Sequence, residues 1–443
     1  MRTPRTVPRN DPAKHAKVNS RHIGLSNPLS EAAISTSLEL ARRLAVTKQH
    51  LAGKTTGSAM DAILSVIRDL GYVQLDPINT VAPSHVLVLW SRVGNFRLSD
   101  LDRLLWDEKK LFEHWSHAAS IVLTEDYPLH YSLMRRYPES LSKSWGGWRA
   151  KARTWLARHT DLRKAILRQL KRGPLRLTEF EEYVPTKRSA DGWTSGSDVS
   201  AALFHLQMRG EVMVVGHQGN QKIWGLPETF LPSWAERKEL TEQEAERAGA
   251  ERTIRALGTA SPSEINIYFL RGRYLNLKKA LEHLQKESTI RRVQITGLAS
   301  KGERYVHDLD IPLLESMHSD AWQPRMSLLA PFDNLISGKD RVNRMFGFDY
   351  VHENYLPPNK RKFGSYVLPI LWGDRFIGRV DPRMDRENER LLINSVHAEP
   401  GAPGGKEVSL EIRETIGHLA EFLGAKEVVY TARVPKAWRN SLR

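Results

Sequence analysis

The sequence predicts an α+β fold of about three tandem winged helix-turn-helix units, followed by a small β-rich C-terminal domain that could close into a barrel. An internal repeat supports the tandem units, because residues 202–207 read ALFHLQ and residues 280–285 read ALEHLQ. Each copy follows a helical segment with a glycine break and precedes alternating apolar and polar residues, as in a β-hairpin. A repeat on this scale indicates a shared supersecondary unit, here a helix-turn-helix with a wing.

The two predicted wings have polar, glycine-containing tips, which are typical of hairpin turns. The first wing has its tip at 216–221, and the second has its tip at 296–303. The tip at 216–221 is a candidate probe of a nucleic-acid groove, and an ordinary exposed turn is the alternative.

The first unit has the least regular pattern of the three. Apolar residues recur at helical spacing over 28–51 and 59–70, and short strands are expected over 72–76 and 85–90. The resulting order of helix, helix, strand and strand is that of a winged helix.

The strand expected over 72–76 would place an amide beside a carboxylate. Val73 and Leu75 alternate with Gln74 and Asp76, so the polar pair shares one exposed face over an apolar backing. A carboxylate can accept a proton from water, and an amide can hold the same water in line. The pair therefore favours hydrolytic chemistry, and a surface strand with two solvated side chains is the alternative.

The later segments are predicted from the same patterns. The basic helical stretch over 143–172 contains tryptophans, which are interpreted as core residues rather than base-stacking residues. Strands over 366–372 and 375–380 flank Gly373 and Asp374, a good hairpin signal, and a helix is expected over 407–423. The predicted divisions are a disordered basic arm at 1–30, winged-helix units at 31–160, 161–235 and 236–322, and the C-terminal domain at 323–443.

Composition narrows the classes of function. The chain has 443 residues and a formal net charge of +15, which favours a polyanionic partner, nucleic acid first and an anionic membrane surface second. No apolar run reaches membrane-spanning length. The absence of cysteine excludes disulfides and cysteine nucleophiles. We expect a monomer in the cytoplasm, associated with the nucleoid, that needs no cofactor.

Several segments, in the same order along the chain, resemble the YcaQ/AlkZ-like bacterial DNA glycosylases, which are built of tandem winged helices. The family carries Gln-apolar-Asp or Gln-apolar-Gln where this chain has Gln74-Leu75-Asp76. His114 and Ala118 depart from the family pattern, which has Tyr and Glu at those positions. The other similar segments are 78–79, 81–82, 87–89, 91–95, 113–119, 331–333, 360–364 and 378–381.

The resemblance implies hydrolysis of the N-glycosidic bond of alkylated purines in duplex DNA by a monofunctional glycosylase, with N7-alkylguanine and N3-alkyladenine as substrates. Interstrand crosslinks are further candidate substrates for the Gln-apolar-Asp branch. Asp76 would activate water, and Gln74 would hold it. The residues expected to contact DNA, from the resemblance, the wing tip and the basic run, are Asn79, Trp115, His117, His217, Gln218, Asn220, Lys222, Lys360, Arg361 and Arg379.

Other interpretations stay open at this point. Trp115 and His117 would support the Gln74 strand from behind if they do not contact a base, and a basic run such as Lys360-Arg361 is often only a solvated face. His114 and His117 are spaced for metal ligation on a helix, but companion ligands are not evident, so no metal is predicted. Residues 401–407 are similar to a phosphate loop with the wrong spacing, and a flexible loop is expected.

The rival function is a non-catalytic winged-helix transcriptional regulator, in which Gln74 would pair with adenine. Asp76 discriminates between the two functions, because a carboxylate beside phosphates weakens binding but serves a hydrolase. A protein that binds a membrane surface is a distant third interpretation.

The net charge generates a first prediction about binding. We expect the logarithm of affinity for duplex DNA to fall linearly with the logarithm of salt concentration, with a slope of about −0.9 for each neutralised phosphate. A fluorescence-anisotropy titration over several salt concentrations measures this slope. A flat titration would contradict the electrostatic interpretation.

Overall fold

The computed structural model describes residues 33–54, 57–183, 198–299, 302–318, 322–431 and 433–442, without the side chains of 181–183. The predicted basic arm at 1–30 lies outside these residues. The described residues belong to one compact unit, Ala33–Arg443.

The first part of this unit alternates helices with short strands. Ser58 caps the opening helix α2 by accepting a hydrogen bond from the backbone NH of Asp61, and Gly71, with φ of +83°, ends it. The strands pair in the order β2-β4-β3. The elements are α2 (Ala59–Leu70), β2 (Val73–Gln74), α3 (Ser84–Val93), α4 (Leu98–Asp102), the π-helical turn η1 (Arg103–Asp107), β3 (Leu111–Trp115) and β4 (Ala119–Leu123).

The same succession of helix, strand, two helices and hairpin occurs twice more. The second set consists of α7 (Thr160–Leu170), β5 (Leu175–Arg176), α8 (Leu177–Tyr183), α9 (Asp198–Met208), β6 (Met213–Gln218) and β7 (Gln221–Gly225). The third set consists of α11 (Glu242–Leu257), β8 (Thr259–Ala260), α12 (Pro262–Ile267), α13 (Leu277–Lys286), β9 (Ile290–Thr296) and β10 (Tyr305–His307). The repeated ALxHLQ segments lie on the corresponding helices α9 and α13. The predicted helices and hairpins at these places are therefore confirmed.

The strand predicted over 85–90 is wrong, because these residues belong to α3. Val86, Leu87, Val88 and Leu89 are all buried, so the apolar run has no polar face to reveal a helical period.

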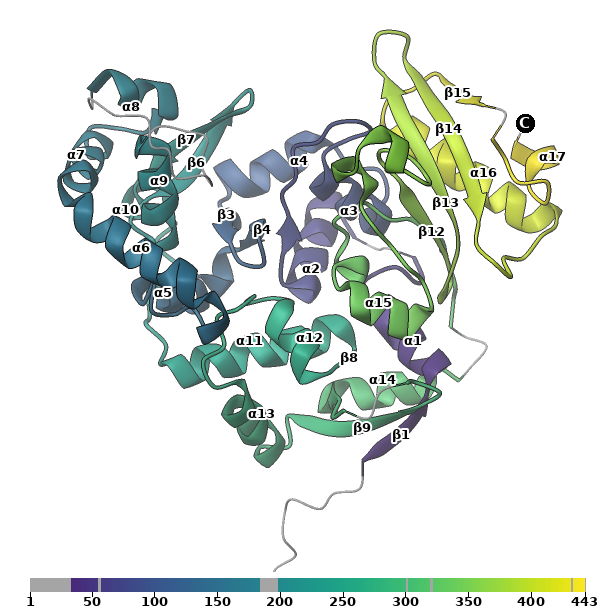
Figure 1. Cartoon of the computed structure of the whole chain (residues 1–443), viewed down its shortest axis with the longest axis horizontal. Coiled ribbons are helices and arrows are strands. Elements are labelled where there is room, and N and C mark those ends of the chain that lie inside the picture. Colours follow the sequence, from purple (N-terminus) through teal and green to yellow (C-terminus); the bar gives the residue numbers. More distant parts are fainter. Residues whose placement is uncertain are drawn as a thin grey trace, which may run out of the picture. The chain divides into compact units, whose positions relative to one another are not determined.

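The β-rich C-terminal domain is an open sheet of order β11-β12-β13-β14-β15, and among the described strands β11 and β15 have one neighbour each. The predicted turn at Gly373, with φ of +57°, joins β12 to β13. Helix α16 shares a hydrophobic core with this sheet and with α2 and α3 (Figure 1). The bounds are β11 (Met326–Leu328), β12 (Leu368–Trp372), β13 (Arg375–Asp385), β14 (Arg390–Ala398), α16 (Lys406–Phe422) and β15 (Glu427–Tyr430).

Residues near the start of the described chain pack far from their sequence neighbours. Strand β1 (Ile34–Ser37) pairs in parallel with β9, as Figure 1 shows. Helix α1 (Leu38–Lys48) follows and buries Leu40 and Leu44 in a core with Val293 and Val306. Strand β1 therefore adds to the sheet of the third set of elements rather than to the sheet of the first set. The predicted domain boundaries stay predictions.

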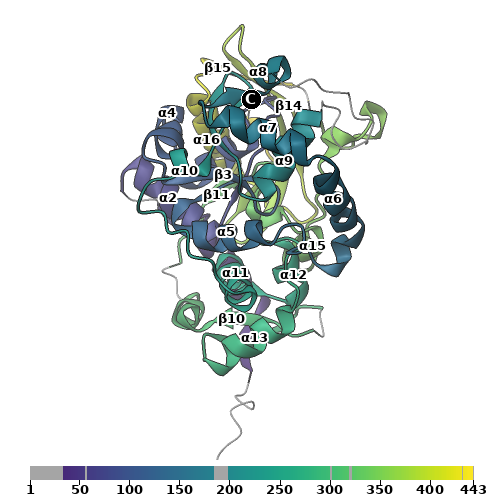
Figure 2. The same cartoon turned by 90° about the vertical axis from the view of Figure 1, so that its left-hand side faces the viewer.

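The tryptophans of the basic helical stretch are half-buried and pack against the protein core, as predicted. Helix α6 (Gly146–Arg158) lies beside α9 in both views (Figures 1 and 2). Trp148 and Trp155 stack on His205 with ring centroids 6.1 and 4.7 Å apart. Trp145 lies against Gly272, where an added Cβ would come within 2.0 Å of the indole nitrogen.

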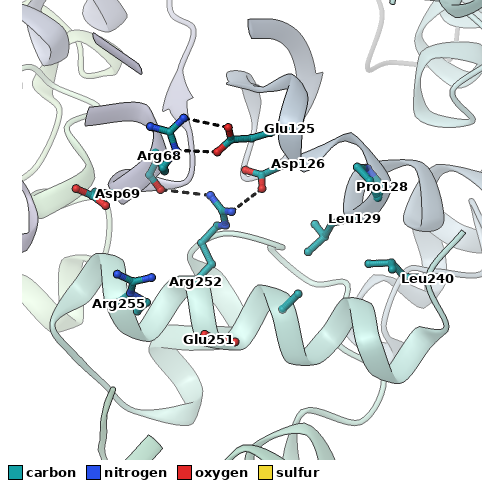
Figure 3. Close-up of a pocket in the computed structure, with 11 residues that line it drawn as sticks. Arg68, Asp69, Glu125, Asp126, Pro128, Leu129, Leu240, Glu251, Arg252 and Arg255 are labelled. Atoms are coloured by element: carbon teal, nitrogen blue, oxygen red, sulfur yellow. Dashed lines mark hydrogen bonds and ion pairs between the residues drawn. The ribbon is translucent and has the colours of Figure 1, made fainter. Parts of the chain in front are cut away.

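Two ion pairs line a polar pocket between the first and third sets of elements (Figure 3), and one of them joins the two sets. Arg68 on α2 donates two hydrogen bonds to Glu125, at 2.8 and 2.9 Å. Arg252 on α11 pairs with Asp126 and also donates to the backbone carbonyl of Arg68, at 3.3 Å. Burial raises the pKa of Asp126 to about 6, against the opposing charge of Arg252. Glu125 and Asp126 therefore neutralise Arg68 and Arg252. The contacts of Arg252 with Asp126 and with the backbone of Arg68 hold α11 against α2.

A buried polar network lies where α1, α3 and α12 meet the C-terminal domain. Arg92 on α3 makes two hydrogen bonds to Asp333, at 2.6 and 2.9 Å, and both side chains are fully buried. Arg92 also donates to Gln49 at the end of α1. Asn334 donates to the backbone carbonyl of Tyr72, and Tyr268 donates to that of Leu70. The network therefore holds the chain on both sides of Gly71, directly before β2.

This network generates a prediction about stability. We expect Arg92→Met to lower the free energy of unfolding by about 3–5 kcal/mol, because Asp333 would keep a buried charge without its partner. Removing both charges, in Arg92→Met with Asp333→Asn, should cost less than the sum of the two single changes. Denaturant unfolding of the wild type and the three variants measures this coupling. Strict additivity would show that the pair has no special role.

Candidate active site

The strand that carries the amide and the carboxylate is short and firmly held. Gln74 pairs with Ser120 of β4, and the backbone NH of Leu75 donates to the carbonyl of Ala119 at 2.8 Å. Gly71 brings the chain over Phe269, where an added Cβ would come within 3.1 Å of the ring and a positive φ would be strained. Position 71 therefore needs glycine to lead α2 into β2.

Asp76 does not lie on an exposed strand face, contrary to the prediction. Its side chain is only 8% exposed, and Tyr72, expected on the same face, is buried. Regular pairing ends at Gln74, so the alternation read over 72–76 stops before Asp76. The carboxylate instead turns back and accepts a hydrogen bond through Oδ1 from the backbone NH of Ile78, at 2.9 Å.

Asp76 and Gln74 have polar atoms that are free to bind a ligand. Among the described residues, Asp76 has no ion-pair partner and its Oδ2 accepts no hydrogen bond, and the half-buried side-chain amide of Gln74 makes none either. Buried carboxylates are normally paired or fully hydrogen-bonded. A partly satisfied carboxylate beside a free amide can therefore bind a water molecule or a developing positive charge.

The C-terminal domain closes one side of this site. Tyr366 donates to the carbonyl of Ala82 at 3.1 Å, and Arg386 donates to the side-chain oxygen of Asn79 at 2.6 Å. Burial lowers the pKa of His352, and the nearby charge of Asp76 opposes this effect. Burial and the same charge raise the pKa of Tyr355.

Sequence reasoning missed His352 and Tyr355. The only available signal was a polar, aromatic stretch just before the basic run at Lys360. Asn79, a predicted DNA contact, is exposed but has its side-chain oxygen engaged by Arg386.

The turn between β3 and β4 closes another side. Nδ1 of His117 donates to the backbone carbonyls of Ile267 and Tyr268, at 2.9 and 2.7 Å, and its ring stacks on Tyr72. Burial lowers the pKa of His117 to about 4, so the ring is neutral at pH 7. The ring of Trp115 packs edge-on against Phe204. His117 therefore supports the strand that carries Gln74 through Tyr72, whereas Trp115 packs against α9, and the roles of both as DNA contacts stay predictions.

Two predicted contacts on the β6–β7 hairpin point back to β3. Glu113 accepts a hydrogen bond from His217 at 2.6 Å and pairs with Lys222 at 3.0 Å. Burial alone would raise the pKa of Glu113, but His217 and Lys222 lower it to about 2. Gln218 accepts from Arg176, and Asn220 is exposed at the tip. The strand ends next to the turn are therefore anchored to β3, and the turn itself, with Asn220, is exposed.

The basic residues of the C-terminal domain differ in their surroundings. Arg379 is buried, pairs with Glu399 at 2.6 Å and lies over the rings of Phe348 and Phe363. Arg361 donates to two backbone carbonyls of its own loop, whereas Lys360 is exposed. Burial of Arg379 gives no support to its predicted contact with DNA, while Lys360 remains accessible to phosphate.

A family model for DNA glycosylases described as AlkZ-like matches residues 67–422, which is most of the chain. The chain belongs to this AlkZ-like DNA glycosylase family. The match begins in α2 and ends in α16, so it includes β2 and the loop that carries His352. The resemblance inferred from the motifs is therefore confirmed, and the family places this protein among the DNA glycosylases of DNA repair.

The fold agrees with a solved member. The structure is similar to the DNA glycosylase AlkZ of Streptomyces sahachiroi, with a TM-score of 0.61 and 17% sequence identity, over 91% of this chain and 100% of the other. At this identity the similarity concerns the fold. Within the described part of the chain, no helix combines the length and apolarity needed to cross a bilayer.

The hairpin anchor generates a prediction with a pH signature. We expect Glu113→Gln to lower the free energy of unfolding at pH 7 by about 1–3 kcal/mol, because Lys222 loses its buried partner. The folded pKa of Glu113 lies at about 2, below its ordinary value of 4.5, so its contribution is complete above pH 4.5 and is lost as pH falls toward 2. The difference between wild type and variant should therefore shrink between pH 7 and pH 3 in denaturant unfolding. A difference that does not change with pH would contradict the ion-pair explanation.

Proposed function

We propose that this AlkZ-like glycosylase hydrolyses the N-glycosidic bond of alkylated purines in duplex DNA, with N7-alkylguanine as the first substrate class and N3-alkyladenine as the second. One observation carries the assignment of the site. Within the described part of the chain, Asp76 keeps an oxygen without a hydrogen-bond partner, and the amide of Gln74, two residues earlier, is also unengaged, while the backbone NH of Leu75 between them is bonded to Ala119.

Cleavage of this N-glycosidic bond needs little help from a general acid. Alkylation at N7 or N3 gives the purine a positive charge, so the bond from the sugar carbon to the base nitrogen breaks with its electron pair leaving on a now neutral base. The sugar becomes oxocarbenium-like, as in other glycoside hydrolyses. Asp76 stabilises this positive charge and accepts a proton from water, whose oxygen bonds to the sugar carbon. Gln74 orients that water, and because water is the nucleophile the enzyme is monofunctional.

We interpret the three recurring sets of elements as winged helices that together bind the duplex. The order of helix, strand, two helices and hairpin supports this interpretation in each set. The accessible tip of the β6–β7 hairpin is a groove probe near the lesion. Unhooking of interstrand crosslinks belongs to the same proposal, because a bulky adduct that cannot be flipped into a closed pocket needs a site with an exposed wall. Tyr355 beside Asp76 is such a wall.

The catalytic pair generates the central prediction. We expect Asp76→Asn to slow excision of N7-methylguanine by about 10²–10⁴-fold, the usual worth of a general base. Asparagine keeps an oxygen for the NH of Ile78, so the fold should be retained. Gln74→Ala should lose less activity, because a displaced water position can partly substitute. Release of free base from a duplex under single-turnover conditions measures both rates, and thermal unfolding checks the fold.

The control is Asp102→Asn, which removes an exposed carboxylate from α4 in the same set of elements. It changes the net charge equally but should leave excision unchanged. Full excision by Asp76→Asn would falsify the catalytic assignment. A regulator would show the reverse order, in which Gln74→Ala weakens sequence-specific binding and Asp76→Asn has little effect.

A further inference from the structure

An exposed aromatic ring, that of Tyr355, is linked through His352 and Tyr366 to the segment that follows the proposed catalytic carboxylate. Tyr355 is 69% exposed, although large apolar rings are usually buried. It ends the short helical turn Glu353–Tyr355 in the C-terminal domain, and its hydroxyl lies within the electrostatic influence of Asp76. The hydrolytic steps do not use this side chain, which so far serves only as an exposed wall of the site.

The loop that presents Tyr355 is fixed by its own polar contacts. Glu353 is buried and accepts hydrogen bonds from the backbone NH groups of Phe363 and Gly364, at 2.7 and 3.1 Å. Arg361 donates to the backbone carbonyls of Leu356 and Asn354, on both sides of the ring. The exposure of Tyr355 is therefore a property of an ordered loop.

His352 packs against the ring of Tyr355. Its imidazole meets the ring of Tyr355 edge-on at 5.1 Å and that of Phe332 at 5.0 Å. Tyr366, which also holds the segment after Asp76, lies 6.2 Å away in the same edge-on arrangement. Both ring nitrogens of His352 are buried and have no hydrogen-bond partner among the residues that the structure describes, so packing fixes the imidazole.

The combination of ring and carboxylate fits a cationic aromatic ligand. The face of an aromatic ring carries negative charge density and attracts cations, and every base offers a flat surface for stacking. A purine alkylated at N7 or N3 is both flat and positively charged until its bond to the sugar breaks. An unmodified purine offers the same area without the charge.

We propose that Tyr355 is the stacking surface for the alkylated purine and discriminates cationic from neutral bases. This inference rests on the proposed function, because it assigns a contact for the same substrate at the same site. His352 is the positioning residue that holds the ring, and the C-terminal domain thereby supplies one wall of the substrate site. The ring face carries the effect, and the hydroxyl does not.

A series of substitutions at Tyr355 separates ring, bulk and hydroxyl. Tyr355→Phe should keep single-turnover excision of N7-methylguanine within about twofold. Tyr355→Leu keeps apolar bulk but has no ring, and it should lose about 3- to 30-fold, the range expected for a cation–π and stacking contact. All variants should unfold at the wild-type temperature, because exposed positions rarely affect stability. Binding to a duplex with an abasic-site analogue should not change, since no base is present to stack.

A second measurement does not depend on hydrolysis. A duplex carrying N7-methylguanine on a 2′-fluorinated sugar resists cleavage, and its affinity relative to undamaged duplex reports recognition alone. We expect the wild type and Tyr355→Phe to prefer the damaged duplex and Tyr355→Leu to lose most of that preference.

The outcomes distinguish this inference from the proposed function. Wild-type protein that prefers the damaged duplex through Tyr355 but releases no base from the natural sugar would contradict hydrolysis and support the stacking contact. Excision by the wild type that Tyr355→Leu leaves unchanged would overturn the stacking contact and leave hydrolysis standing. Equal losses in Tyr355→Phe and Tyr355→Leu would assign the effect to the hydroxyl and also overturn it.

Discussion

The ion pair between Arg92 and Asp333 is the constraint on which the site depends. It lies in the dry interior, where two charges are tolerated only with each other and with further hydrogen bonds. Gln49 and Asn334 extend it to α1 and to the backbone on either side of Gly71. The position of β2 is thus set by side chains from three separate parts of the chain.

The buried carboxylates of this protein differ in whether a cationic side chain pairs with them. Glu113 contacts His217 and Lys222, Glu264 pairs with Arg304, Arg341 and Arg344, and these partners lower the pKa of each carboxyl to about 2. Asp333 has Arg92. Asp76 is nearly as buried but has no cation among the described residues. Arg92, Arg304, Arg341 and Arg379 are buried against Asp333, Glu264 and Glu399, so these charges nearly cancel and most of the net positive charge stays at the surface.

The sequence predicted those features that depend on local periodicity or on motif order. The corresponding helices α9 and α13 carry the repeated ALxHLQ segment, and the Gln74-Leu75-Asp76 motif indicated the candidate site, whose catalytic role stays a prediction. Helix α3 was missed because an apolar run buried on all sides has no period to read. The burial of Asp76 and the approach of Tyr355 could not be predicted, since both arise where β2 meets a loop of the C-terminal domain far along the chain.

The parallel pairing of β1 with β9 has a consequence for synthesis of the chain. The ribosome releases Ile34–Ser37 early, but their partner strand emerges only after some two thirds of the protein has been made. Until then β1 and the apolar face of α1 remain without their native neighbours, in the way that long-range pairing delays folding and leaves intermediates open to aggregation. Nascent chains of this glycosylase should therefore depend on chaperones over that interval more than a protein whose first helix packs against the second.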